Sequence, residues 1–253
     1  MKITFLGSGT SQGVPMIACE CEVCTSTNPK DKRLRSSILI ETDDQTIIVD
    51  TGPDFRYQML RAQVKKLDAV VFTHEHKDHV AGLDDVRGFN YIMKKSMQIY
   101  ATENVQTALK RDFHYAFGQN KYPGVPQLEL NTITSLPFQI ENLKLIPIQL
   151  KHYKMDVFGY RIGNFAYLTD ANYIAEGEMK KLKGLDVLVI NALQKTSHIS
   201  HFTLDEALDV IGQLKPKKAY LTHISHRMGK YDDVSKELPE NVELAYDGLV
   251  VEV

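Results

Sequence analysis

The stretch from His74 to His79 carries most of the chemistry that this sequence is expected to perform. It holds three histidines and an aspartate within six residues: His74, His76, Asp78 and His79. Because side chains two apart in an extended chain point the same way, His74 and His76 can hold one metal ion. Asp78 and His79 lie past the bend and can face a second ion. Neutral imidazole and carboxylate suit zinc, manganese or iron, so the spacing favours a metal site over a solvated polar turn.

The cysteines form a second cluster, because Cys19, Cys21 and Cys24 lie within six residues. An odd, clustered set fits metal thiolates better than disulfide bonds. Their loop runs to about Lys32 and is rich in Pro, Asn, Thr and charged residues, so it should need an anchor. A metal ion bound by the cysteines would supply one. The alternative is a reduced, inert trio on a loop.

Four further polar residues follow apolar strands, namely His152, Asp170, His201 and His223. Taken singly, each has an ordinary structural explanation, such as surface exposure or the capping of a turn. Ligands at the ends of neighbouring strands would nevertheless gather at one edge of a sheet. Together with the histidine motif, the four residues therefore outline a larger constellation.

Strands and helices that would position these residues can be read along the chain. Strands are predicted at 2–6, 36–41, 46–50, 69–72, 97–100, 138–140, 143–149, 156–162, 165–169, 185–190 and 218–222. Helices are predicted to begin near 54 and end near 64, and to span 84–94, 103–111, 176–183 and 203–214. We expect an irregular loop over 113–126 and a hairpin of two last strands around Asp247-Gly248. Two mixed sheets with helices on their outer faces would fit this order.

Length and composition suit one large globular domain spanning 1–253. The chain has 253 residues, of which 43% are hydrophobic and 25% charged, and its formal net charge is -2. This charge argues against a nucleic-acid coat or a basic membrane-surface protein. No apolar run approaches the roughly 18 residues of a membrane helix, and the N-terminal stretch does not fit a signal peptide. We therefore expect a soluble, cytoplasmic protein.

The constellation resembles the metallo-β-lactamase superfamily over the whole length of the chain. The residues that carry the resemblance are Thr73 to His79, Asp50-Thr51-Gly52, His152, Asp170 and His223. The resemblance implies an α+β fold, a four-layer αββα sandwich with a dinuclear site at one edge of the sheets. By analogy, one ion takes His74, His76 and His152, the other takes Asp78, His79 and His223, and Asp170 bridges them.

More specific features resemble the PhnP-type phosphodiesterases: the stretch 9–15, Cys19-x-Cys21-x-x-Cys24, and the stretch 222–226. In those enzymes three cysteines and a late histidine hold a separate structural zinc, and His226 matches the fourth ligand. Three thiolates and one imidazole form a closed structural site. The implied cofactors are thus two catalytic divalent metals, Zn or Mn, and one structural Zn.

The resemblance implies a phosphodiesterase that hydrolyses small cyclic or ribosyl phosphodiesters with a water activated by two metal ions. Asp78 and His201 are the expected catalytic residues. His201 matches a family position proposed to protonate a leaving group, and an imidazole near its ordinary pKa suits that task. The expected partner is a small-molecule phosphodiester. No membrane or nucleic-acid partner is expected, and a homodimer is compatible with the sequence.

Two other functions stay open at this point. A tRNase Z-like 3′-processing nuclease shares His-x-His-x-Asp-His, but that branch carries a long exosite arm between the third histidine and the bridging aspartate. Here His152 to Asp170 leaves room only for a turn and two strands. A PqqB-like, non-hydrolytic or biosynthetic binding protein would keep the fold, and the complete ligand set counts against it.

Four residues could support the site from outside the ligand set. Asp50 and Asp54 could orient ligand imidazoles as hydrogen-bond acceptors, or be turn residues. Arg33 and Arg35 could contact phosphate, or form a solvated basic face. His114 and His198 have no assigned role.

Overall fold

Two facing β-sheets form the centre of the computed structural model, which describes residues 1–118 and 122–253. In spatial order, the strands of the first sheet are β15 (Val250–Glu252), β1 (Lys2–Gly7), β2 (Ser37–Glu41), β3 (Thr46–Val49), β4 (Ala69–Val71), β5 (Met97–Ala101) and β6 (Leu128–Thr132). Those of the second are β11 (Tyr173–Ile174), β8 (Leu143–His152), β9 (Met155–Ile162), β10 (Phe165–Leu168), β12 (Val187–Asn191), β13 (Lys218–Thr222) and β14 (Val242–Leu244), with β7 (Phe138–Ile140) paired to β8.

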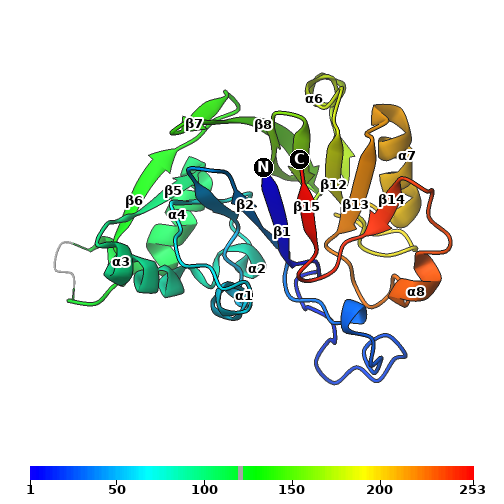
Figure 1. The fold of residues 1–253 in the computed structure, drawn as a ribbon, viewed down its shortest axis with the longest axis horizontal. Coiled ribbons are helices and arrows are strands. Elements are labelled where there is room, and N and C mark those ends of the chain that lie inside the picture. The colour runs from blue at the N-terminus through cyan, green and yellow to red at the C-terminus, as the bar shows by residue number, and fades with distance from the viewer. Residues whose placement is uncertain (119–121) are drawn as a thin grey trace.

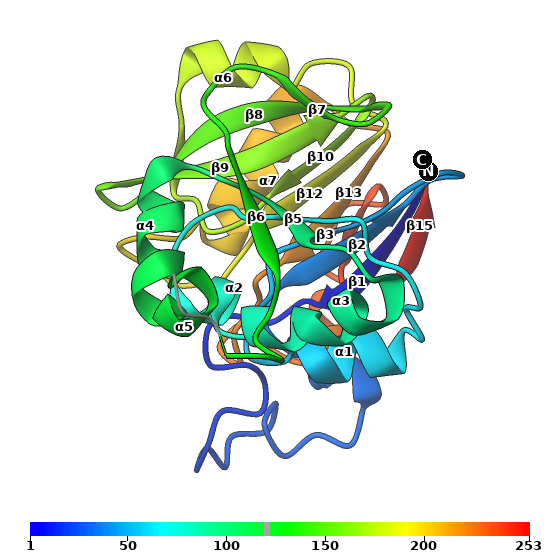
Figure 2. The same ribbon diagram turned by 90° about the vertical axis from the view of Figure 1, so that its left-hand side faces the viewer.

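Helices cover the outer face of each sheet (Figures 1 and 2). On the first sheet lie α1 (Phe55–Arg61), α2 (Lys77–Val80), η2 (Leu83–Val86), α3 (Arg87–Met93), α4 (Glu103–Asp112) and α5 (His114–Phe117). On the second lie α6 (Glu176–Lys181), α7 (Leu204–Leu214) and α8 (Tyr231–Val234). The short η1 (Pro29–Asp31) lies in the cysteine loop. Within the described ranges, no helix is long and apolar enough to cross a lipid bilayer.

Three apolar layers hold these elements together. The middle layer lies between the sheets and contains side chains such as Phe5, Ile47 and Tyr167. Because helices bury the outer faces as well, β3, β4 and β12 are apolar on both sides, as expected for strands inside a sandwich. Two outer clusters join each sheet to its helices. The expected α+β, four-layer αββα architecture is therefore confirmed.

Helix α7 shows how the sequence specifies one of these layers. The Thr203 hydroxyl accepts a hydrogen bond from the backbone of Glu206, whose carboxylate accepts one from the Thr203 backbone, so the predicted capping box is present. Its buried residues Ala207, Val210, Ile211 and Leu214 follow helical spacing and face the second sheet.

One edge strand was not predicted, and two local expectations were wrong. Strand β6 was missed because only Leu128 and Leu130 of this edge strand pack on the core, which leaves a weak alternation. The expected irregular loop over 113–126 contains a helical turn, α5, at His114–Phe117, and residues 119–121 of it lie outside the described ranges. The last two strands form no hairpin: β14 pairs with β13 and β15 with β1, so Asp247-Gly248 joins the two sheets. The Asp247 carboxylate accepts hydrogen bonds from the backbone of Ser8 and Leu34, which fixes this crossing.

Candidate metal centre

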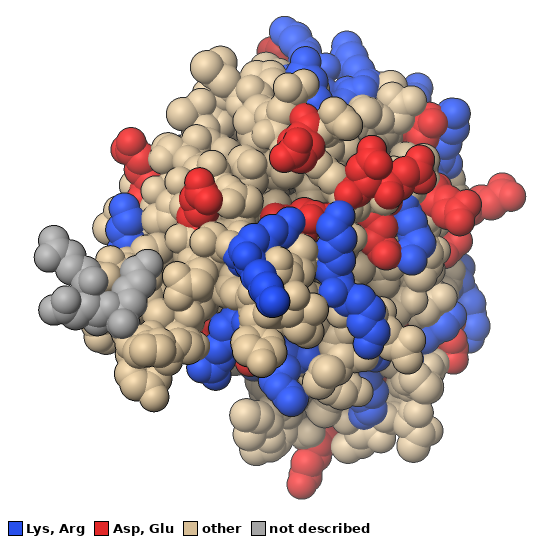
Figure 3. All heavy atoms as spheres, turned by 60° about the vertical axis from the view of Figure 1, so that its left-hand side comes forward, with Lys and Arg blue, Asp and Glu red and all other residues tan. Residues whose placement is uncertain are grey.

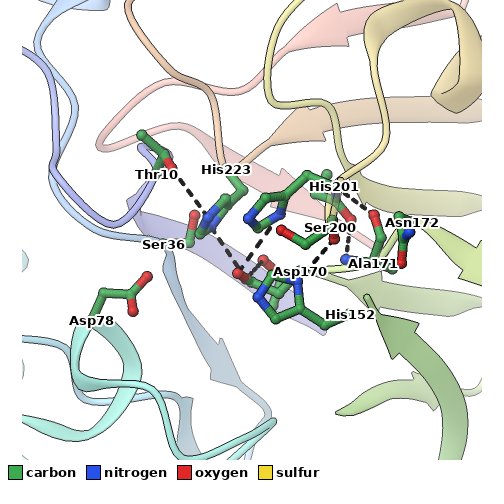
Figure 4. Close-up of polar contacts among 12 residues, drawn as sticks. Thr10, Ser36, Asp78, His152, Asp170, Ala171, Asn172, Ser200, His201 and His223 are labelled. Carbon is green, nitrogen blue, oxygen red and sulfur yellow. Dashed lines mark hydrogen bonds and ion pairs between the residues drawn. The ribbon is translucent and has the colours of Figure 1, made fainter. Parts of the chain in front are cut away.

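The predicted ligands follow the carboxyl ends of strands. The histidine motif follows β4, His152 is the last residue of β8, and Asp170 and His223 come just after β10 and β13. Strands β10, β12 and β13 are parallel, so their carboxyl ends meet at one edge of the sheet. Figure 4 shows the side chains of His152, Asp170 and His223 converging there from separate segments.

The first ligand group consists of His74, His76 and His152, whose ligand nitrogens lie within 4.8 Å of one another. The His74 Nε2 atom is buried and makes no hydrogen bond. His152 Nδ1 lies 2.8 Å from the carbonyl oxygen of Ser200, so it donates its proton there and leaves Nε2 free as a ligand.

The second group consists of Asp78, His79, Asp170 and His223, again within 4.8 Å. His79 Nε2 lies 3.2 Å from a carboxylate oxygen of Asp78 and 3.2 Å from one of Asp170. His223 Nδ1 lies 3.2 Å from Asp170 Oδ2. Both ring nitrogens are buried without a hydrogen bond. Buried polar atoms without partners are rare, and a divalent cation would be a common partner for these nitrogens and carboxylates.

Asp170 lies between the two groups. Its carboxylate and the ring nitrogens of His152 and His201 also come within 4.8 Å of one another. This carboxylate thus reaches both the first group, through His152, and the second, through His79 and His223. The side chains fit a pair of neighbouring divalent ions, the cofactor type that the fold family implies.

Burial controls the protonation of most of the histidines. It holds the pKa of His74 well below its ordinary value and lowers the pKa values of His76 and His223. These imidazoles are therefore neutral at pH 7, the form that binds metal. Burial, together with His223, also lowers the pKa of His201 to about 3. The expectation of an ordinary pKa for His201 was wrong, because its ring lies inside the histidine cluster.

His79 behaves differently because carboxylates surround it. Burial acts to lower its pKa, but Asp170, Asp78 and Asp50 outweigh burial and raise this pKa well above its ordinary value. Burial acts to raise the pKa values of Asp78 and Asp170, but neighbouring histidines outweigh it and lower both. The group thus attracts a positive charge, so a metal ion competes with a proton on His79 and binds more weakly as the pH falls.

Asp50 orients ligands of both groups from a fully buried position. Its Oδ2 atom accepts hydrogen bonds from His79 Nδ1 at 2.7 Å and from the Thr73 hydroxyl at 2.8 Å, and Oδ1 accepts one from the Thr73 backbone at 2.9 Å. The same hydroxyl lies 3.0 Å from His74 Nδ1. Asp50 therefore directs the protons of His79 and His74 to Nδ1, which supports its suggested role as an acceptor for ligand imidazoles.

Backbone geometry brings the turns of the site close together. Asp50, Asp170 and His223 have positive φ angles of 66°, 54° and 56°, a region that non-glycine residues rarely occupy and that clusters at functional sites. At Gly52, an added Cβ atom would lie 2.1 Å from the backbone oxygen of Asp78. Only glycine lets the turn after β3 approach the helix that carries Asp78.

The cysteine cluster forms a separate candidate site with His226. One ligand atom each from Cys19, Cys21, Cys24 and His226 lies within 4.8 Å of the others. The sulfur atoms of Cys19 and Cys21 lie 3.2 and 3.4 Å from His226 Nδ1. Hydrogen bonds, chiefly from the Cys24 backbone, lower the pKa of Cys21 to about 6, whereas burial raises that of Cys24 to about 11. The set suits a closed tetrahedral zinc site.

The remaining candidates lie outside the ligand groups. Arg33 is buried and donates to Ser8 and to the Ala245 backbone, so it is neither a solvated nor a phosphate-facing residue. Arg35 binds the carboxylate of Asp54 at 3.1 Å, and Asp54 touches no ligand imidazole.

Sequence reasoning missed two contacts to ligands. The Thr10 hydroxyl lies 3.3 Å from His223 Nε2, and the Ser200 carbonyl binds His152. The ring of His198, which had no assigned role, lies tilted beside that of His201, with 5.2 Å between ring centroids. Thr10 lies in the stretch 9–15 that carries the resemblance to the PhnP-type phosphodiesterases, but that stretch does not indicate its contact with His223.

Comparison with known proteins identifies the family. The profile of the β-lactamase superfamily domain matches residues 45–224. A solved structure described as a new diphosphatase from the PhnP family is 40% identical, covers 99% of this chain and 96% of that chain, and superposes with a TM-score of 0.93. Zn(2+)-bound PqqB from Methylobacterium extorquens is 18% identical, with full coverage of both chains and a TM-score of 0.80, a likeness of fold alone.

A curated relative is longer than this chain. An octanoyltransferase of Porphyromonas gingivalis is 42% identical over 252 residues, which is 98% of this chain and 51% of that protein. The chain thus spans about half the length of this relative. From the profile match and the full-length likeness to the diphosphatase, the chain belongs to the metallo-β-lactamase superfamily and, within it, to the PhnP family.

Proposed function

We propose that this chain is a metal-dependent phosphodiesterase that hydrolyses small cyclic or ribosyl phosphodiesters. The observation that carries the proposal is the pair of adjacent ligand groups that share Asp170 at one sheet edge. The 40% identity to a PhnP-family diphosphatase supports hydrolysis at phosphorus. Substrates with a diphosphate bond therefore belong in the same test.

In this proposal, His74, His76 and His152 would hold one ion, Asp78, His79 and His223 would hold the other, and Asp170 would serve both. When bound, two divalent ions activate a water molecule and neutralise charge on the phosphoryl oxygens. Cys19, Cys21, Cys24 and His226 hold a structural zinc. This zinc would link the loop that carries the three cysteines to the proposed metal centre, because His226 lies three residues after His223.

His201 is the proposed proton donor to the leaving group. Its ring lies 4.6 Å from the His152 ring and 4.8 Å from the His223 ring, measured between centroids, so it borders both ligand groups. Its Nδ1 atom is buried without a hydrogen bond and lies 3.9 Å from Asp170 Oδ1. The low pKa keeps His201 neutral in the free protein, so negative charge on the bound diester and its leaving group must raise that pKa before Nδ1 delivers a proton.

A tRNA-processing role is less well supported. Strands β8 and β9 are joined through Tyr153-Lys154, and β9 and β10 through Gly163-Asn164, so no exosite arm lies between His152 and Asp170. On the face drawn in Figure 3, lysine and arginine are interspersed with aspartate and glutamate. The coloured residues of that face therefore offer no uniformly basic surface for a nucleic-acid backbone.

Hydrolysis of bis-nitrophenyl phosphate, a 2′,3′-cyclic nucleotide and a nucleoside diphosphate sugar, each with Zn or Mn restored, tests the proposal. We expect turnover of at least one substrate and a loss of more than about 100-fold in H76A, since even outer partners of metal ligands cost 10–100-fold. H114A is the matched control, because His114 lies outside both ligand groups. Absence of turnover on all three would reject the proposal, and octanoyl transfer by the same preparation would favour the activity named for the longer relative.

A further inference from the structure

Asn172 joins two loops that border the proposed metal centre. It lies two residues after Asp170 and is half-buried. Its Oδ1 atom accepts a hydrogen bond from the backbone N–H of Tyr153 at 2.9 Å, and its Nδ2 atom donates one to the carbonyl of Ile199 at 3.1 Å. Tyr153 directly follows the ligand His152, and Ile199 lies two residues before His201.

The backbone around Asn172 strengthens this connection. The Asn172 N–H donates to the carbonyl of Lys151 at 2.8 Å, and the Phe202 N–H donates to the carbonyl of Ala171 at 2.7 Å. Figure 4 shows Asn172 and Ala171 beside Ser200, on the far side of Asp170 from Asp78. The short segment 170–172 therefore contacts the residues that precede His152 and those that follow His201.

The side-chain link requires an amide. One atom must accept from a backbone N–H while another donates to a backbone C=O, and a carboxylate offers acceptors alone. Tyr153 has a positive φ of 57°, a conformation that needs support from its surroundings. The loop 195–199 is exposed, and the Asn172 bond to the Ile199 carbonyl ties its end nearest His201 to the segment that follows Asp170.

We infer that Asn172 is a positioning residue that holds the His201 loop at a fixed distance from the metal centre. The inference rests on the proposed function for its kinetic consequence, because His201 acts there on the leaving group. Asn172 itself lies outside all the ligand groups. Its effect is therefore largest on reactions that need proton delivery, since small misplacements of a catalytic group are costly.

The variant N172D tests the two hydrogen bonds of the Asn172 side chain separately. Aspartate keeps an acceptor for the Tyr153 N–H but cannot donate to the Ile199 carbonyl. We expect N172D to lower turnover of the 2′,3′-cyclic nucleotide, an alkoxide leaving group, by about 10–100-fold. Bis-nitrophenyl phosphate should lose less than about threefold, because nitrophenolate leaves without a proton. N172A, which lacks both bonds, should lose turnover on both substrates.

N241A is the matched control. Asn241 Nδ2 also donates to a backbone carbonyl, that of Pro216, at 3.3 Å. Asn241 directly precedes β14 and lies beside the first residues of β13. It is therefore at the amino end of β13, whereas His223 follows the carboxyl end of that strand. N241A should lower the melting temperature about as much as N172D while turnover of both substrates stays at the wild-type level.

Hydrogen exchange gives a readout that does not depend on turnover. In purified protein, N172D should raise amide exchange at Phe202, whose N–H donates to the Ala171 carbonyl, about tenfold, the worth of one hydrogen bond, while Tyr153 and the stretch 74–80 stay unchanged. Unchanged exchange at Phe202 in N172D, or equal losses on both substrates in N172D, would overturn the inference. If the wild type cleaves no diester, the proposed function fails, and the exchange result alone then decides whether Asn172 holds the loop.

Discussion

Replacing Asp50 by asparagine should weaken metal binding without removing any ligand. The substitution keeps the size of the side chain and exchanges one carboxylate oxygen for an amide NH₂. Every group around this side chain is a donor: the Thr73 backbone faces Oδ1, and the Thr73 hydroxyl and His79 Nδ1 face Oδ2. Wherever the new NH₂ group points, two donors meet in a fully buried place.

Two arrangements remain for D50N, and both are unfavourable. With NH₂ toward the Thr73 backbone, one buried hydrogen bond stays unmade, which costs about 1–3 kcal/mol. With NH₂ toward His79, the ring must move its proton to Nε2, the atom that faces Asp78 and Asp170. In that tautomer, Nε2 carries a proton and cannot bind metal. We therefore expect each ion to bind about 10–100-fold more weakly, the usual cost of losing such a partner.

Competition with a chelator measures this effect in purified protein. D54N is the control, because the Asp54 carboxylate binds Arg35 and no ligand imidazole. We expect wild-type affinity in D54N and a loss at both ions in D50N, since Thr73 relays the effect of Asp50 to His74. Wild-type affinity in D50N, or an equal loss in both variants, would refute the reasoning.

Three further substitutions test other parts of the centre. D170A should abolish diester hydrolysis and leave the fold intact, as measured by turnover and circular dichroism; a variant that still turns over would reject Asp170 as the bridge. C21S should lower the zinc content by about one ion and the melting temperature with it, so an unchanged metal count would remove the structural zinc. H201A should reduce turnover of the cyclic nucleotide by about 10²–10⁴-fold and that of bis-nitrophenyl phosphate far less, whereas equal losses would exclude proton donation by His201.

The residues of the candidate ligand groups could be found in the sequence because their signals are local. Histidines two apart after an apolar run, or a polar residue just beyond a strand, can be read without knowing what lies across the sheet. Asp50 could be proposed as a residue near the site in the same way, because it is the last residue of a predicted strand. Parallel strands then bring such residues to one edge, which the structure confirms for β10, β12 and β13.

What could not be predicted depends on contacts between distant segments. Thr10 lies 213 residues before His223, and nothing in either segment announces their contact. Arg33 resembles a surface residue in sequence, but it is buried against the segment around Ala245. The pKa of His201 follows from a cluster of rings that exists only in the folded chain. The pairing of β14 and β15 with different sheets is likewise a tertiary outcome.

The most direct test counts metal ions per chain in protein purified without added metal and measures diester turnover on the same samples. The account predicts about three ions, one of which is lost in C21S, and turnover that disappears in H76A. About one tightly held zinc, with no turnover after zinc or manganese is restored, would contradict the dinuclear phosphodiesterase. That result would retain the cysteine site and favour a binding or biosynthetic protein of the same fold.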